Sequence, residues 1–159
     1  MDFFYYRRSK VYIMKYTLQE GSFSLFPAAW QDTSMTILRD DESGLSVVVS
    51  RGAIPAGSDV EKEFHRQWDV LRMQMGEINQ SDFHWVTAGP DGNIPAIEVE
   101  TAFERNGQRL WQRQLAVQTP DKPAMMIFTL SALRPFTEED DGHWNTLKQT
   151  LTLHNNRSV

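Results

Sequence analysis

The sequence predicts an α+β domain with a largely antiparallel sheet and two main helices. Several runs alternate apolar with polar residues and are separated by turn sequences, as expected for antiparallel strands. Two other segments carry apolar residues at spacings of three or four, as expected for helices that pack on a sheet. The order strands, helix, strands, helix therefore favours a sheet with a helix on at least one face and an open face that forms a groove.

The N-terminal segment MDFFYYRRSKVYI lacks the apolar stretch ending in small residues that a secretory signal needs. We expect residues 1–13 to be a non-native or disordered extension from an upstream start codon, with Met14 as the natural start. An edge strand is the alternative for this segment. Residues 14–159 should form a single domain, since a chain of 159 residues is long enough to bury one core.

Short apolar-rich runs predict strands at residues 16–18 and 22–25 and a hairpin formed by residues 33–39 and 45–53. The turn of this hairpin is acidic and ends at Gly44. Glycine adopts the positive φ that such a turn needs, which favours a tight connection between the two strands.

The first helix should begin at Ser58, a favourable N-cap followed three residues later by Glu61. It should end before Gly76. Its apolar stripe consists of Val60, Phe64, Trp68, Leu71 and Met75. This spacing places the stripe on one side of the helix, so we expect the helix to pack on the sheet.

From residue 83 onward the apolar period returns to two, which predicts strands at 83–88, 94–105, 108–118 and 124–132. Asn106-Gly107 lies between the two long strands and is a strong hairpin signal.

The second helix should follow the N-cap Thr137, with Trp144, Leu147 and Leu151 as its apolar stripe. Its first turn contains the acidic run 138–141. We interpret this run as capping rather than as a metal site, because carboxylates near a helix N-terminus interact favourably with the helix dipole.

Alternation along the strands divides their side chains between a covered and an open face. The side chains expected under a helix are Ile97, Val99 and Phe103, with Trp111, Leu115 and Val117 on the next strand. Glu98, Glu100 and Glu104 should lie on the opposite face. The core should also receive Leu38, Leu45, Val47 and Val49. Met35 and Ile37 should then emerge on the same open side as Gln112 and Gln114.

This mixture of side chains is typical of a surface that binds helices of a partner protein. Met and Ile side chains can bury an apolar helix, while glutamine amides can bond to backbone groups of a helix rich in small residues. The alternative is that Met35 and Ile37 belong to the core and that the glutamines are solvated surface residues.

Composition excludes several functional classes. Lys and Arg number 16 against 21 Asp and Glu, giving a net charge of −5 that repels phosphate backbones, so nucleic acid is not expected as a partner. The absence of cysteine excludes disulfides, thiolate metal sites, a cysteine nucleophile and a lipoprotein anchor. No segment approaches the roughly 18 apolar residues of a membrane span, so we expect a soluble protein without stable membrane insertion.

The sequence also contains no catalytic motif of a metalloprotease, serine hydrolase, P-loop or dinucleotide-binding type. His65 lies near Glu61 and Asp69 on one helix side, and this arrangement is explained by i,i+4 charge pairing rather than by a base or a metal site. We therefore expect no enzyme activity, no catalytic residue, no metal and no cofactor. A generic protein-interaction domain and a small hydrolase or ligand-binding domain remain alternatives.

Two segments, EGSFSLFPAAWQDTSMTIL and DVEKEFHRQWDVLRMQM, with the order of elements after them, resemble the Eag chaperones. These are DcrB-like proteins encoded beside type VI secretion effectors in Gram-negative bacteria. The resemblance covers most of residues 14–153. It implies a PsbP/Mog1-like fold and a cytoplasmic homodimer shaped as a clasp. It further implies binding of the N-terminal transmembrane-helical segments of an effector, which keeps the effector soluble before it is loaded on the spike protein.

The same resemblance implies which residues contact the effector helices. Met35 and Ile37 match two branched apolar positions of the family, although Met35 departs from the branched pattern. The implied glutamine contacts are Gln67 or Gln74 on the first helix and Gln112 or Gln114 on a later strand.

Overall fold

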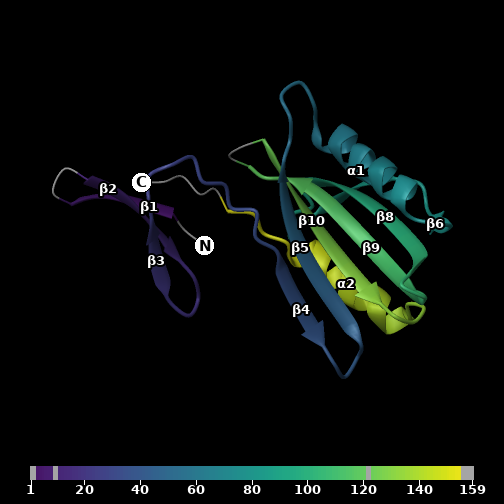
Figure 1. The fold of residues 1–159 in the computed structure, drawn as a ribbon. Helices are drawn as coiled ribbons and strands as arrows, with labels where there is room; N and C mark the ends of the chain where they lie inside the picture. Colours follow the sequence, from purple (N-terminus) through teal and green to yellow (C-terminus); the bar gives the residue numbers. More distant parts are fainter. Residues whose placement is uncertain (1–2, 9–10, 121–122, 155–159) are drawn as a thin grey trace. The chain divides into compact units, whose positions relative to one another are not determined.

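A computed structural model describes residues 3–8, 11–120 and 123–154 (Figure 1). The chain divides into two compact units, Met1–Asp32 and Thr33–Val159. The second unit holds both helices and the larger sheet.

The first unit is a three-stranded antiparallel sheet in the order β1-β2-β3. Its strands are β1 (Phe3–Arg8), β2 (Val11–Thr17) and β3 (Ser22–Leu25). Tyr16 on β2 is buried, its ring lies 5.3 Å from that of Phe23, and its hydroxyl donates to Asp32 Oδ2 at 3.1 Å. Strand β3 has the predicted bounds, whereas β2 begins earlier than predicted.

Strand β1 lies within residues 1–13, the segment expected to be an extension, of which residues 1–2 and 9–10 lie outside the described residues. It pairs with β2 so that Tyr5 is opposite Met14. The start of the natural chain at Met14 stays a prediction.

The second unit contains a seven-stranded sheet whose pairings are all antiparallel. The order across the sheet is β4-β5-β10-β9-β8-β6, and β7 also pairs with β8. The strands are β4 (Thr36–Asp40), β5 (Leu45–Ala53), β6 (Ile78–Gln80), β7 (His84–Ala88), β8 (Ile94–Arg105), β9 (Gln108–Gln118) and β10 (Ala124–Ala132). The predicted α+β class with a largely antiparallel sheet is confirmed.

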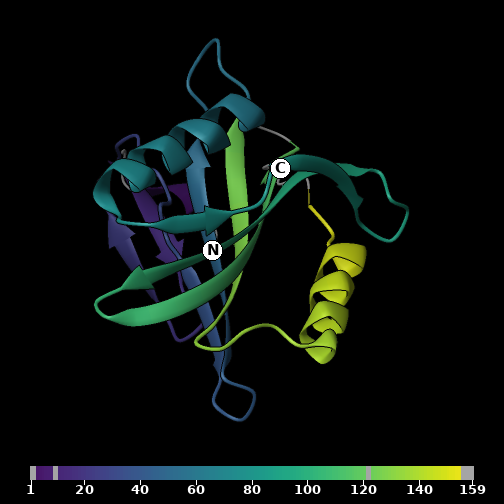
Figure 2. The same cartoon turned by 90° about the vertical axis from the view of Figure 1, so that its right-hand side faces the viewer.

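Helices α1 (Val60–Gln74) and α2 (Glu138–Thr150) lie on opposite faces of this sheet (Figure 2). The prediction that Ser58 caps α1 is wrong by one residue. Asp59 has the extended backbone of an N-cap, and its side chain accepts a hydrogen bond from the Lys62 backbone N–H at 2.8 Å. The predicted cap of α2 is confirmed, because Thr137 and Asp140 form a reciprocal capping box.

Two turns have the geometry that their residues predict. Gly44 closes the β4–β5 turn with a φ of 77°, and its backbone N–H donates to Asp40 O at 2.9 Å. Asn106 and Gly107 both have positive φ angles, as a two-residue hairpin between β8 and β9 requires.

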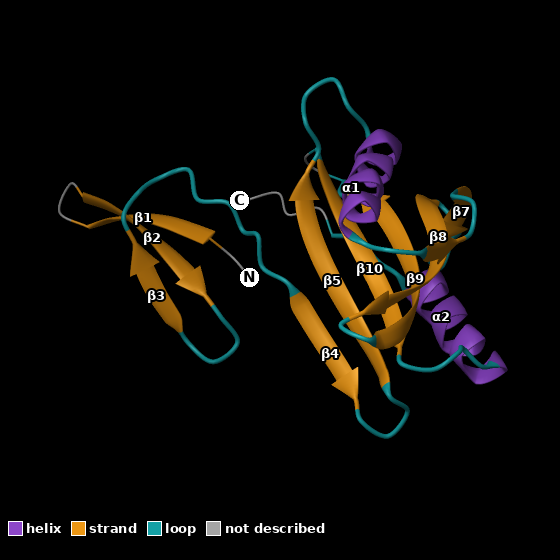
Figure 3. Ribbon diagram, turned by 45° about the vertical axis from the view of Figure 1, so that its right-hand side comes forward, coloured by secondary structure: helices purple, strands orange, loops and turns teal. Residues whose placement is uncertain are grey.

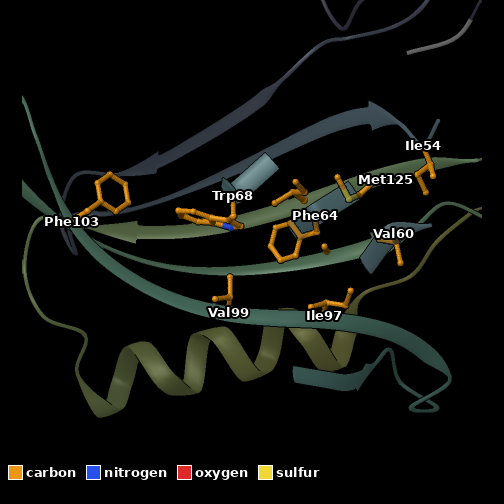
Figure 4. Packing of buried hydrophobic residues seen from close by; sticks show 10 residues of the cluster. Ile54, Val60, Phe64, Trp68, Ile97, Val99, Phe103 and Met125 are labelled. Carbon is orange, nitrogen blue, oxygen red and sulfur yellow. The ribbon is translucent and has the colours of Figure 1, made fainter. Parts of the chain in front are cut away.

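A hydrophobic cluster fills the space between α1 and the sheet (Figure 4). Phe64 and Trp68 of the helix are both at most 2% exposed. The sheet side of this cluster consists of Ile97, Val99, Phe103, Ala116, Met125 and Ile127. A second cluster packs against α2 through Trp144, with Leu115, Val117, Phe128 and Leu130 from the sheet.

The predicted division of the two faces is therefore partly wrong. Residues directly opposite each other in a sheet share a face, and Ile97 is opposite Ala116 while Glu98 is opposite Leu115. Leu115 and Val117 thus lie under α2, not under α1 with Ile97. The Glu98 face is not open, since Glu98 accepts a hydrogen bond from Trp144 Nε1 at 2.6 Å and one from Lys148 Nζ at 3.1 Å.

Candidate functional site

Strand β4 is an edge of the larger sheet and exposes apolar side chains on both faces. Ile37 is opposite Val48 and Leu38 is opposite Val47 on β5. Ile37 is 61% exposed, Leu38 59%, and Met35, which precedes the strand, 60%. Because successive strand residues point to opposite faces, Ile37 lies on one face and Leu38 on the other. Met35 lies two residues before Ile37, and an extended backbone there would place it on the Ile37 face. The expectation that Leu38 belongs to the core is therefore wrong.

The strand register places Ile37 on the same face as both glutamines of β9. One row of opposite residues runs from Ile37 through Val48, Thr129 and Gln114 to Val99. The adjacent row contains Ser46, Ser131, Gln112 and Thr101. The predicted shared face of Ile37, Gln112 and Gln114 is confirmed, but it is the face on which α1 packs. The assignment of Met35 to this face stays a prediction.

Helix α1 covers only part of this face. Its buried side chains contact residues of β8, β9 and β10, whereas the side chains of β4 and β5 on the same face are exposed or half-buried. Figure 3 shows α1 crossing one end of the sheet, with β4 and much of β5 away from the helix. We call the uncovered part, formed by Met35, Ile37, Ser46, Val48 and Gln112, the open surface.

The two glutamines of β9 differ in how far their amides are already engaged. Gln114 Oε1 accepts a hydrogen bond from Trp68 Nε1 at 2.9 Å, and Gln114 Nε2 donates to Thr129 Oγ1 at 3.0 Å. Gln112 is half-buried, and its amide forms no hydrogen bond with another described residue. Of the two, Gln112 therefore has the amide available to a partner.

Gln67 and Gln74 lie on the side of α1 that faces β5. A Cβ built on Gly52 of β5 would be 3.8 Å from Gln67 Nε2, so Gln67 lies over this strand. Gln74 is about two helical turns further along the same side and is exposed. Gln67 thus lies over the C-terminal part of β5, beyond Ser46 and Val48 of the open surface. Gln74 lies at the C-terminal end of the helix.

An ion pair on this side of the helix fixes a buried carboxylate. Glu63 is 3% exposed and accepts two hydrogen bonds from the Arg66 guanidinium, at 2.9 and 2.6 Å. These bonds hold the pKa of Glu63 below its ordinary value. The pair joins two side chains within the first turns of α1, and the Gln67 amide lies 3.5 Å from Glu63 Oε1.

The described residues offer no evident site for chemistry. They contain no group of three or more His, Asp or Glu side chains able to hold a metal ion. His65, considered above as a base or ligand, instead packs its ring 4.1 Å from that of Phe83. The expectation of no enzyme activity stays a prediction. No helix within the described part of the chain is long and apolar enough to cross a membrane.

One concave feature of the larger unit was not predicted from the sequence. Leu38 lines a pocket of about 590 Å³ between the β4–β5 hairpin and α2, on the face opposite the open surface. An apolar residue on each face of a short strand next to an acidic turn is the signal that marks this pocket in the sequence. It was not recognised because Leu38 was assigned to the core.

The chain is similar to one protein family in sequence and to solved structures in fold. The family model of DcrB matches residues 20–150 of the chain. No curated protein matches the chain in sequence. A crystal structure of a Pseudomonas aeruginosa protein of unknown function, described as a candidate regulator, is similar with a TM-score of 0.70 and 24% identity. The match covers 90% of this chain and 98% of that protein, and at this identity it establishes the fold alone.

Proposed function

The chain belongs to the DcrB family, and from this premise we propose that it is an effector-specific chaperone of a type VI secretion system. It would bind the N-terminal transmembrane helices of an effector on the open surface. This binding would keep the effector soluble in the cytoplasm until it is loaded on the spike protein.

The observation that carries this proposal is the exposure of Met35 and Ile37 on a face where α1 leaves β4 uncovered. Two neighbouring apolar side chains that are both about 60% exposed leave apolar area in contact with water. Covering such area contributes roughly 25 cal/mol per Å². An apolar helix laid along β4 would gain this contribution and would itself be removed from water.

The polar part of the open surface suits the backbone of such a helix. Gln112 carries an amide with two N–H donors and one carbonyl acceptor, and Ser46 and Ser131 lie next to it across the sheet. Helices rich in small residues bring their backbone carbonyls within reach of such groups. Because these contacts involve the backbone of the bound helix, they favour apolar helices as a class and do not require one particular sequence.

The resemblance to Eag chaperones names the client class more closely. A transmembrane segment in the cytosol exposes apolar side chains on all sides, so it aggregates or enters a membrane unless a protein covers it. A chaperone encoded with its effector would supply that cover. The neighbouring gene should then encode a protein with transmembrane helices near its N-terminus.

Co-expression tests the proposed role. The effector's N-terminal segment is produced with and without this chain, and its soluble yield is compared. We expect soluble segment only when the chain is present. A second segment, in which the apolar helices are replaced by an amphipathic soluble helix of equal length, serves as the control. Equal soluble yields of the effector segment in both cultures would refute the role, and equal capture of the amphipathic helix would indicate a generic protein-interaction domain.

A further inference from the structure

A second surface of the larger unit combines a concave apolar interior with an acidic rim. The pocket of about 590 Å³ between the β4–β5 hairpin and α2 lies on the opposite face of β4 from the open surface. Its volume falls within the range of sites that hold small ligands or anchoring side chains. Its apolar lining consists of Leu38, Leu45, Val47, Leu130, Trp144 and Leu147.

Both walls of this pocket are held in place by one arginine. Arg134 donates to the Ser43 carbonyl of the β4–β5 turn at 2.9 Å and to Asp140 Oδ2 at the start of α2 at 2.6 Å. Arg134 therefore connects the turn to the helix N-terminus in the protein without a bound partner. A pocket whose walls are fixed before binding loses less conformational entropy when it is filled.

The rim of the pocket carries mainly negative charge. Asp40 and Glu42 come from the turn and Glu139 from α2, against two basic lining residues, Arg39 and His143. In the described part of the chain, neither Glu42 nor Glu139 forms an ion pair with Lys or Arg. The Glu42 carboxylate is thus available to a bound group on one wall of the pocket, while Glu139 Oε1 on the other wall lies 3.7 Å from His143 Nε2.

We propose that this pocket binds a short basic segment of a partner protein, which inserts one apolar side chain beside Leu38 and places Lys or Arg on the rim. The apolar interior supplies the affinity, because a filled pocket excludes water from the anchoring side chain. The acidic rim supplies selectivity, since it attracts cationic flanks and repels acidic ones. This inference does not depend on the proposed chaperone role, because it concerns the other face of the sheet.

Nuclear magnetic resonance titration of the full-length, ¹⁵N-labelled chain tests the proposal with three synthetic peptides. KRLFRK carries both the apolar anchor and the basic flanks, KRSSRK lacks the anchor, and EELFEE reverses the charge. We expect KRLFRK to shift the backbone signals of Leu38 and Val47 and the indole signal of Trp144, which all line the pocket. It should bind at least about tenfold more tightly than either control peptide, and more weakly at high salt.

Matched variants assign the binding to this pocket. Leu38→Gln and the pair Glu42→Lys with Glu139→Lys should each weaken KRLFRK binding at least about fivefold. Met73→Gln, which changes a side chain 87% exposed on α1, should leave it unchanged. Absence of shifts at millimolar KRLFRK, equal affinity for all three peptides, or shifts confined to residues outside the pocket would each overturn the proposal.

Discussion

Trp68 of helix α1 donates its indole N–H to the side-chain oxygen of Gln114 on strand β9, at 2.9 Å. The indole is 2% exposed, so it has no access to water as an alternative acceptor. Gln114 in turn donates to Thr129 on β10 at 3.0 Å. A residue that sequence analysis assigned to the binding of a partner thus also connects the helix to two strands.

Replacing Gln114 by Ala should therefore destabilise the fold. The substitution leaves the buried Trp68 N–H without an acceptor, which costs about 1–3 kcal/mol. We expect the midpoint of urea unfolding to fall, with a smaller free energy of unfolding and an unchanged denaturant slope.

Gln112→Ala is the matched control, because Gln112 lies on the same strand and face but forms no hydrogen bond with another described residue. Its free energy of unfolding should stay within about 0.5 kcal/mol of the wild-type value. Equal stability of the two variants would contradict the structural role of Gln114.

Much of the fold follows from local signals in the sequence. Strands β8, β9 and β10 have the predicted bounds, because apolar-rich runs flanked by turn sequences, among them Asn106-Gly107 between β8 and β9, define them without reference to the rest of the chain. The capping box of α2 is also local, since Thr137 and Asp140 are three residues apart. Such features depend on neighbours in the sequence and can therefore be predicted from it.

The distribution of side chains between the two faces of the sheet does not follow from neighbouring residues in the sequence. Both β8 and β9 carry apolar residues on each face, so alternation alone does not reveal that α2 covers Glu98 and Leu115. That assignment depends on the pairing of distant strands and on which face each helix occupies. Leu38 was misassigned for a related reason, because β4 is an edge strand and the core does not extend to it.

The ion pair between Arg134 and Asp140 predicts a loss of stability in acid. Hydrogen bonds from Arg134, supported by the Thr137 backbone N–H, lower the pKa of Asp140 from 3.8 to about 2. As the pH falls below 3.8, the unfolded chain takes up this proton first, so the contribution present at neutral pH is lost between pH 4 and 2. It amounts to about 2 kcal/mol.

Urea unfolding at several pH values measures this effect. Asp140→Asn should be less stable than the wild type at pH 7, and the difference should shrink as the pH approaches 2. Asp41→Asn, which changes an exposed carboxylate in the β4–β5 turn, is the control and should follow the wild-type curve. A stability difference between Asp140→Asn and the wild type that does not depend on pH would contradict a lowered pKa of Asp140 in the folded protein.

The size of the proposed client predicts that the chain acts as a homodimer. A transmembrane helix of about 20 residues is about 30 Å long, whereas the five residues of β4 extend over roughly 17 Å. Two copies that face the same helix would provide the cover that one open surface lacks. Light scattering at micromolar concentration should give twice the mass of the chain.

The same measurement is repeated after adding the effector segment. A dimer that persists, with the mass increased by the bound segment, is the expected result. A monomer both with and without the segment would contradict a clasp of two copies, while leaving binding to a single copy to be measured separately.

The most direct test of the open surface compares two variants of the same strand. In the first, Met35→Gln and Ile37→Gln place polar groups on the open surface, and in the second, Leu38→Gln places one on the opposite face. All three side chains are about 60% exposed, so the free energy of unfolding should change little in either variant.

The affinity for the effector's N-terminal segment should distinguish the two variants. Each polar group left unpaired against a bound apolar helix costs about 1–3 kcal/mol, so we predict at least a tenfold loss of affinity in the Met35 and Ile37 variant. The Leu38 variant should bind as the wild type does. Full-strength binding by a well-folded Met35 and Ile37 variant would contradict the assignment of the client site to the open surface.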